Sequence, residues 1–255
     1  MNYGKDARTL AHINMYAMLS CMSELCAISP AASVLASPDK PVVLCLKIRR
    51  GPALTMTFER GICKTYEGSY THDILLRFPS YEKFNGMLDK SRIPIPIKGF
   101  GKQAFLRRNF SLLSDILGKY LGTVETGQFN EAFFQDSTSL LFSVYADAIA
   151  QVANQDSIGR FTASGMVDGT LVMSIQNGPK AALQVAGHTI KRLSDIPDSP
   201  TAIVEFKSAR VARDVFDGRQ GIPVCLGTGL MEPGGHMGLL LPFYRLLERV
   251  AVYLR

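Results

Sequence analysis

The feature that most constrains this chain is an internal repeat, in which short motifs recur in the same order roughly half a chain apart. The stretch 44–58, LCLKIRRGPALTMTF, matches 171–185, LVMSIQNGPKAALQV, with a leucine, an isoleucine and a Gly-Pro pair at the same places. Farther along, 74–89 (ILLRFPSYEKFNGMLD) matches 202–217 (AIVEFKSARVARDVFD). Because self-similarity at a fixed spacing indicates repeated structural units, the sequence predicts two copies of one domain.

The position of the repeat predicts how the 255 residues divide. We expect a first domain at 1–121, a linker at 122–136 and a second domain at 137–255. Each copy then has about 110–120 residues, a normal size for an independent hydrophobic core. Hydrophobic residues make up 47% of the chain and charged residues 20%, values that are ordinary for a globular protein.

The apolar periodicity within each copy predicts a helix, a meander of short strands, a second helix, a further strand and a terminal helix. Ser80 and Ser208 stand where they would cap the second helix of each copy. In the first copy the predicted elements are the helices 7–26 and 109–121 and the strands 42–48, 53–60, 62–68 and 73–78. We therefore expect an α+β fold of two tandem units, each with a mostly antiparallel or mixed sheet of about five strands covered by helices.

Residues 93–104, IPIPIKGFGKQA, have the layout of a dinucleotide-binding loop, with a strand, a Gly-x-Gly turn and a helix. The second copy matches this stretch at 221–229, GIPVCLGTG, which places Gly99 on Gly227. There the stretch runs on to a glutamate, which puts an acid where a phosphate would sit. The prolines at 94 and 96 suit an edge strand, because both lack the N–H that a central strand would donate. We interpret the glycines as a sharp backbone bend.

Residues with catalytic chemistry are sparse. The five cysteines stand mostly in apolar runs, which is typical of reduced core thiols in a cytoplasmic protein. Charged residues near the N-terminus occupy the place of a signal peptide's apolar run. The four histidines stand apart in the sequence; we assign His72 to a turn and His236 to a flexible glycine loop at 232–238. The sequence therefore predicts no catalytic residue, no metal site and no cofactor.

The net charge of +6 is concentrated in the first half, where residues 1–127 carry 17 Lys/Arg and 10 Asp/Glu. Such one-sided charge is typical of a protein with an anionic partner. Nucleic acid is disfavoured, because the basic residues are scattered and no recognition motif is present. We expect a transient contact with an anionic membrane surface. The residues expected to face it are Arg49, Arg50, Lys98, Lys102, Arg107 and Arg108.

Three motifs of the first copy recur in softer form in the second. They are the hairpin IRRGPALTMTFERG, the strand DILLRF followed by SYEKFNGMLDK, and IPIPIKGFGKQAFLRRNFSLLSDIL. The second copy has IQNGPKAALQVAG, AIVEFKSARVARDVFDG and IPVCLGTG. This arrangement resembles the sterol carrier protein 2 (SCP2) family, in which a strand ends in a glycine turn and the last helices help to close an apolar tunnel. The chain departs from the family at the turn before the fourth strand, where only Asp89-Lys90 and Asp217-Gly218 correspond.

The resemblance implies non-catalytic binding or carriage of an apolar ligand, either a fatty acyl chain, a sterol-like lipid or a quinone. Two alternatives stay open: a scaffold with filled pockets that binds a protein, and a hydrolase or transferase that uses the glycine loop. The residues expected to line an apolar pocket are Phe84, Met87, Leu88, Phe100, Phe105, Leu113, Ile116 and Leu117 in the first copy, and Phe206, Val215, Phe216, Leu240, Phe243, Tyr244 and Leu247 in the second.

Overall fold

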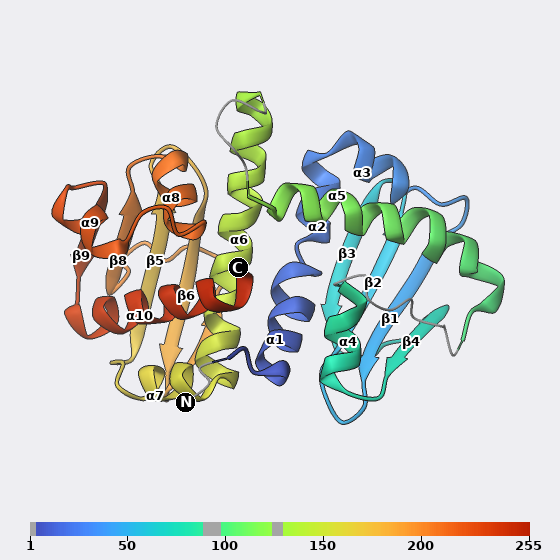
Figure 1. Cartoon of the computed structure of the whole chain (residues 1–255), viewed down its shortest axis with the longest axis horizontal. Coiled ribbons are helices and arrows are strands. Elements are labelled where there is room, and N and C mark those ends of the chain that lie inside the picture. Colours follow the sequence, from blue (N-terminus) through green and yellow to red (C-terminus); the bar gives the residue numbers. More distant parts are fainter. Residues whose placement is uncertain (1–3, 89–97, 124–129) are drawn as a thin grey trace. The chain divides into compact units, whose positions relative to one another are not determined.

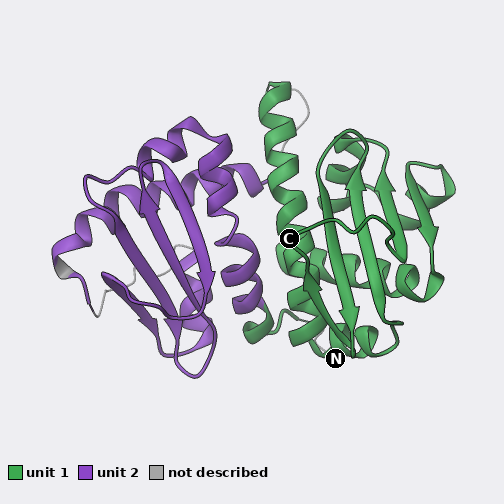
Figure 2. Ribbon diagram, turned by 180° about the vertical axis from the view of Figure 1, so that it is seen from behind, with its two compact units in different colours: residues 1–9, 123–255 green, residues 10–122 purple. Residues whose placement is uncertain are grey.

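The computed structural model describes residues 4–88, 98–123 and 130–255 (Figure 1). The chain forms two compact units, coloured separately in Figure 2. The N-terminal unit is Leu10–Gly122, and the C-terminal unit is Thr123–Arg255 together with the residues up to Thr9. Each unit has one mixed β-sheet and a set of helices, which confirms the predicted α+β fold class.

The N-terminal unit has a sheet of four described strands in the order β3-β2-β1-β4. Neighbours β1–β2 and β2–β3 pair antiparallel, whereas β4 pairs parallel with β1. In Figure 1, α4 and α5 lie in front of this sheet. From the N-terminus to residue 122 the elements are α1 (Ala7–Ile13), η1 (Asn14–Met18), α2 (Met22–Ile28), α3 (Pro30–Leu35), β1 (Val42–Ile48), β2 (Ala53–Glu59), β3 (Ile62–Glu67), β4 (Ile74–Phe78), α4 (Tyr81–Leu88), η2 (Phe100–Lys102), η3 (Phe105–Phe110) and α5 (Ser111–Leu121).

The C-terminal unit repeats this order and adds a fifth strand, giving β7-β6-β5-β8-β9. Its fourth strand β8 again pairs parallel with the first, β5, and β9 pairs antiparallel with β8. The elements are α6 (Glu131–Gln155), α7 (Ser157–Ser164), β5 (Gly169–Ile175), β6 (Lys180–Ala186), β7 (Thr189–Arg192), β8 (Ala202–Phe206), α8 (Ala209–Phe216), α9 (Ile222–Gly227), β9 (Met231–Gly235) and α10 (Met237–Leu254). No helix of the described residues is long and apolar enough to cross a membrane.

Both sheets turn at the same places. The first hairpin of each unit has a non-glycine residue at positive φ, Arg50 at 55° and Asn177 at 57°. The second hairpin has two consecutive positive φ values in each unit, at Arg60-Gly61 and at Gly187-His188. Two such residues form the two-residue turn that best matches the twist of paired strands. The predicted helix caps are also present: the Ser208 side chain accepts a hydrogen bond from the Val211 N–H, and Ser80 accepts one from the Lys83 N–H.

Three sequence-based predictions about the elements were wrong. The strands do not form a simple meander, because β4 and β8 return to lie beside the first strand of their sheets. Residues 222–227 form helix α9 rather than a strand, and the predicted flexible loop 232–238 is mostly strand β9 and the start of α10. Apart from these three, the long helix α6 begins at Glu131, within residues 122–136.

The structure has a backbone bend at Gly99, as predicted. The glycine that corresponds to it in the C-terminal unit is not the one that the sequence alignment matched. Lys98 bridges Leu75 of β4, just as Gly234 pairs with Ile203 of β8, so Gly99 corresponds to Gly235 and not to Gly227. Gly99 has a φ of +92° and Gly235 a φ of +89°. The predicted proline strand at 93–97 lies outside the described residues. Lys98 itself pairs antiparallel with β4, whereas the residue before the glycine turn of a dinucleotide-binding fold belongs to a parallel strand.

A buried ionic cluster holds α7 against α10 in the C-terminal unit. Asp156 caps α7 through the Gly159 N–H and is 1% exposed at its side chain. Arg249 of α10 donates to both of its carboxylate oxygens, at 3.1 and 2.7 Å, and the Tyr253 hydroxyl donates at 2.6 Å. Burial raises the pKa of Asp156, but the hydrogen bonds from Arg249, Tyr253 and Gly159 outweigh it and lower the pKa below its ordinary value.

We expect Gly235→Ala to destabilise the protein by more than about 1 kcal/mol, because its φ is positive and a Cβ there would lie 2.3 Å from the Thr201 carbonyl oxygen. Urea unfolding measures the change. Gly234→Ala is the matched control, since a Cβ at that position meets nothing within 4 Å. Equal unfolding free energies for the two variants would contradict the prediction that residue 235 must be glycine.

We expect Asp156→Asn to lower the free energy of unfolding by about 3 kcal/mol at neutral pH, because Arg249 loses its buried partner. The folded pKa is depressed, so this stabilisation is present above the unfolded pKa of about 4 and is lost as the pH falls below it. Urea titrations from pH 7 downwards should show the gap between wild type and variant closing. Asp195→Asn, at an exposed carboxylate, should change stability little at any pH; a gap independent of pH would exclude the carboxylate as its cause.

Candidate functional site

The C-terminal unit contains a cavity of about 170 Å³ between α8, α9 and α10. Its apolar walls come from four elements that are distant in the sequence, and its opening is polar. The apolar lining residues are Tyr145 of α6, Val215 of α8, Ile222 of α9, and Leu247 and Ala251 of α10. The polar lining residues are Gln220, Glu248 and Arg255, next to Gly218 and Gly221. The lining is thus mixed, with exposed polar groups beside the apolar ones, and the cavity is partly open to solvent.

Arg255 reaches its place because the residue beneath it is glycine. Gly218 has a φ of +72°, and a Cβ there would lie 2.1 Å from the Arg255 guanidinium carbon. The guanidinium donates hydrogen bonds to the Phe216 and Val215 carbonyl oxygens at 3.4 and 3.3 Å. These carbonyls end helix α8, where a cation is favourable. Arg255 itself is exposed, so its charge faces the cavity opening.

The back wall of the cavity is held by one aromatic pair. The Tyr145 ring stacks on the Phe216 ring with centroids 4.1 Å apart and an angle of 16° between the planes. Its hydroxyl donates to the Phe216 carbonyl oxygen at 2.7 Å. Burial raises the pKa of Tyr145, so the phenol stays neutral across the physiological range. The wall is therefore rigid and uncharged.

A buried arginine fixes α8 behind this wall. Arg213 is fully buried, and its Nε donates to the Asp217 carboxylate at 3.1 Å while an Nη donates to the Ser137 hydroxyl at 2.8 Å. Asp217 also pairs with Arg219. An unpaired buried charge would be costly, so these partners determine where α8 can sit on α6.

The cavity can bind but offers little for catalysis. None of its ten lining residues is a serine, cysteine, histidine or lysine. Tyr145 uses its hydroxyl in a buried hydrogen bond, and Glu248 is exposed at the opening. A nucleophile with an adjacent base, which group transfer needs, is absent from the lining. The arrangement suits reversible binding of an apolar group with a polar end.

Of the lining residues expected in the second copy, the structure brings Val215 and Leu247 into the cavity. The others are buried with them in the same core but do not line it: Phe206, Phe216, Leu240, Phe243 and Tyr244. Phe216 stacks on Tyr145, which does line the cavity, and so helps to position that ring.

The residues expected to line a pocket in the first copy contribute to the core of the N-terminal unit. Phe84 packs edge-on against Phe78 of β4, with ring centroids 5.2 Å apart. Phe105 contacts Phe58 of β2 at 5.1 Å. Phe84, Phe105, Leu113 and Leu117 are buried, Met87, Leu88 and Ile116 are half-buried, and the side chain of Phe100 lies outside the described residues.

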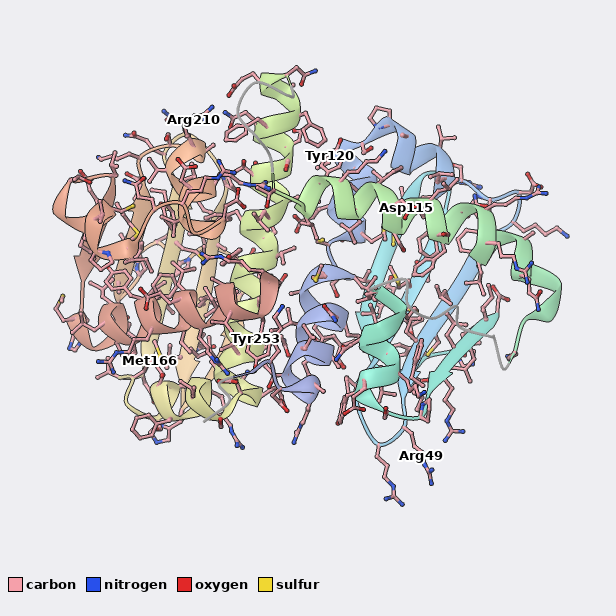
Figure 3. The ribbon with its side chains drawn as sticks, viewed as in Figure 1. Arg49, Asp115, Tyr120, Met166, Arg210 and Tyr253 are labelled. Atoms are coloured by element: carbon pink, nitrogen blue, oxygen red, sulfur yellow. The ribbon has the colours of Figure 1, made fainter. Side chains whose placement is uncertain are left out.

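The six basic residues expected on one membrane face lie at two ends of the N-terminal sheet. Arg49 follows the end of β1 (Figure 3), whereas Lys102 pairs at 2.9 Å with Asp73, whose carboxylate accepts from the Val43 N–H at the start of β1. Seven residues of strand separate the two places by about 20 Å. Arg50 lies with Arg49; Lys98, Arg107 and Arg108 lie at the other end, near Lys102. The six residues thus form two groups, one at each end of the N-terminal sheet.

The two histidines that could suggest chemistry have structural hydrogen bonds. His236 caps α10, where its Nδ1 accepts from the Gly238 N–H at 3.0 Å. His72 Nδ1 lies 2.7 Å from the Tyr70 carbonyl oxygen in the turn before β4. Neither residue lines the cavity. The geometry therefore does not favour a hydrolase or transferase that uses the 232–238 segment.

Sequence reasoning missed most of the cavity opening. Ala251 and Arg255 follow Leu247 at intervals of four, so the helical periodicity of 238–254 already placed all three on one face. Tyr145 and Ile222 carried no such signal, because α6 and α9 meet α10 only in the folded unit.

Comparison with known proteins returns similar folds only. No family model matches the chain, and no curated protein matches its sequence. Among solved structures, it is similar to the UbiJ-SCP2 ubiquinone synthesis protein at 14% identity, covering 42% of this chain and 95% of that one, with a TM-score of 0.33. The sterol carrier protein domain 2 of Helicoverpa armigera shares 17% identity over 42% of this chain and 85% of its own, with a TM-score of 0.32.

Sterol carrier protein 2 from Yarrowia lipolytica is also similar, at 12% identity, over 45% of this chain and 91% of its own, with a TM-score of 0.31. Each of these matches spans less than half of the chain. SCP2 domains are thus among the solved structures that this chain resembles.

Proposed function

We propose that the C-terminal unit reversibly binds the acyl chain of a small lipid in the cavity between α8, α9 and α10. The observation that carries this proposal is the cavity itself, with Val215, Ile222 and Leu247 inside and Arg255 at its opening. Burial of apolar surface supplies about 25 cal/mol per Å², so a methylene chain gains affinity from these walls. The absence of a nucleophile from the lining makes binding, not turnover, the proposed activity.

The size of the cavity selects among the three ligand classes that the sequence resemblance implies. Sites for drug-sized molecules enclose roughly 300–1,000 Å³, and this cavity encloses about 170 Å³. A rigid sterol nucleus or a substituted quinone ring is broad, whereas a single acyl chain is narrow and flexible. We therefore propose an acyl ligand of medium length, with its polar end at Gln220 and Arg255.

The same reasoning assigns the N-terminal unit a different role. We propose that the two units are tandem SCP2-like domains, an interpretation supported by their shared strand order and their shared turns. The rings of Phe84 and Phe105 pack on sheet phenylalanines in the first of them. This packing favours the scaffold alternative for the N-terminal unit, while lipid binding belongs to the C-terminal one.

The direct test is isothermal titration calorimetry with decanoic acid, with native mass spectrometry of the purified protein to detect a lipid already bound. We expect Ala251→Phe to weaken binding at least about tenfold, because the new ring fills the cavity next to Leu247. Val252→Phe is the matched control, since Val252 is 42% exposed and does not line the cavity. Urea unfolding of both variants shows whether the larger ring has also strained the core.

The opening is tested with a second variant. Arg255→Gln should weaken decanoic acid but leave its methyl ester unchanged, because only the acid carries a carboxylate for the guanidinium. Unimpaired binding by Ala251→Phe would show that the ligand does not occupy the cavity. A protein that takes up neither probe, with intact folding, would refute the lipid-binding proposal.

A further inference from the structure

The sheet of the N-terminal unit has a second face, opposite the helices. Alternate residues of β1, β2 and β4 point to the helices and are buried; Phe58 meets Phe105, and Phe78 meets Phe84. The residues between them point the other way. Figure 2 shows the N-terminal sheet from behind, the side opposite α4 and α5. We call this the outer face; its residues include Cys45, Lys47, Thr55, Lys64, Tyr66 and Arg77.

The segment that joins β3 to β4 crosses the outer face and places a tyrosine on it. The Tyr70 N–H donates to the Thr55 hydroxyl at 3.1 Å, and that hydroxyl donates to the Gly68 carbonyl oxygen at 2.9 Å. Next to them, the Cys45 thiol lies 3.4 Å from the Ser69 hydroxyl. Backbone and side-chain bonds to the sheet thus hold Tyr70 in place, and the residue is 59% exposed.

Tyr70 forms a pair with Tyr66 of β3. Their ring centroids are 6.2 Å apart with an angle of 71° between the planes, an edge-to-face contact. Tyr66 is 47% exposed and lies opposite Thr55 in the strand register. Two solvent-exposed aromatic rings fixed on a sheet form a surface on which flat, unsaturated rings can stack.

Three exposed cations stand on the same face around this pair. Lys64 precedes Tyr66 by one full strand repeat and lies opposite Thr57, and Lys47 lies directly opposite Arg77 across β1 and β4. Neighbouring strands are about 4.8 Å apart, which places Lys47 on the order of 10 Å from Tyr66. Of the nearby carboxylates, Glu67 follows Tyr66 on β3 and points to the opposite side of the strand, Glu59 lies 3.8 Å from Arg60, and Asp73 lies 2.9 Å from Lys102.

The charge of the whole unit agrees with that of this face. Residues 10–122 carry 15 Lys/Arg and 8 Asp/Glu, a net charge of +7. The remaining residues carry 13 Lys/Arg and 14 Asp/Glu, a net charge of −1. A surface that combines stacking rings with a surplus of cations complements a chain of phosphates and bases.

We propose that the outer face of the N-terminal unit binds single-stranded nucleic acid, with bases stacked on Tyr66 and Tyr70 and phosphates at Lys47, Lys64 and Arg77. This revises the sequence-based expectation, which excluded nucleic acid because the basic residues are scattered along the chain. Strand register brings Lys47 beside Arg77, thirty positions later in the sequence, and puts Lys64 on the same face; register cannot be read from sequence order. The site is independent of the proposed acyl cavity.

The C-terminal unit supplies a comparison within the same chain. Its β7 carries Lys191 opposite Gln184, as β3 carries Lys64 opposite Thr57. At the place of Tyr66 it has Leu193, whose N–H donates to the Ala182 carbonyl oxygen. The cation is thus repeated while the aromatic pair is not, so Lys191 provides a control for non-specific charge.

The test is fluorescence anisotropy of the full chain with a fluorescein-labelled oligo(U) RNA of about 12 nucleotides, within the usual length of such sites. We expect micromolar binding at low salt and a plot of log affinity against log salt with a slope of about −2, as three phosphate contacts predict. Tyr66→Ala with Tyr70→Ala should weaken binding at least about tenfold. Tyr66→Phe with Tyr70→Phe should retain it, because the stacking rings remain.

Variants that remove one positive charge distinguish binding at the outer face from non-specific attraction of RNA to the basic surface. Lys64→Gln should reduce the salt slope by about 0.7, and Lys191→Gln should leave it unchanged. Two results would overturn the proposal: RNA binding that the tyrosine-to-alanine variant does not weaken, and binding of phosphatidylserine vesicles without binding of RNA. The first would show that net charge alone attracts polyanions, and the second that the face contacts a lipid surface.

Discussion

The structure of each unit depends on the parallel pairing of its first strand with its fourth, β1 with β4 and β5 with β8. A parallel pair cannot be closed by a tight turn, so the chain must cross two strands before the fourth begins. In the N-terminal unit the crossing segment runs over the outer face, tied down at Thr55 and Cys45. The crossing thereby leaves the other face to the helices and separates this sheet into a helix-covered side and an outer side.

Much of this could be predicted from the sequence, and the failures share one physical cause. Strand 42–48 and the caps at Ser80 and Ser208 are local features, and the structure confirms them. Alternating apolar residues show which side chains of a strand share a face of the sheet, but not which strands are neighbours. The pattern therefore could not show that β4 lies beside β1. Residues 222–227 are a short apolar run, which suits a strand or a buried helix equally. Strand β9 contains Pro233 and two glycines, and only its pairing with β8 makes it a strand.

The candidate site shows the same division between local and tertiary information. Helical spacing placed Leu247, Ala251 and Arg255 on one face of α10, but the opposite wall comes from Tyr145 and Ile222. Tyr145 is located by its stacking on Phe216, and α8 by the buried pairs of Arg213. These contacts join residues more than seventy positions apart, and no periodicity within one element encodes them.

Gly218 explains why the arginine at the cavity opening of the C-terminal unit has no counterpart among the described residues of the N-terminal unit. Arg255 lies where a Cβ on Gly218 would be, and the repeat has Lys90 at the corresponding place in the sequence. The arginine-lined opening therefore depends on a residue that the N-terminal unit does not share. The exposed tyrosine pair shows the reverse asymmetry, since Leu193 stands where the first copy has Tyr66. Two sheets with the same strand order and turns thus carry a cavity in the nearly neutral unit and an aromatic, basic face in the unit of charge +7. The parallel strand pair constrains the backbone of both units in the same way. The units differ in side chains that this pairing does not constrain.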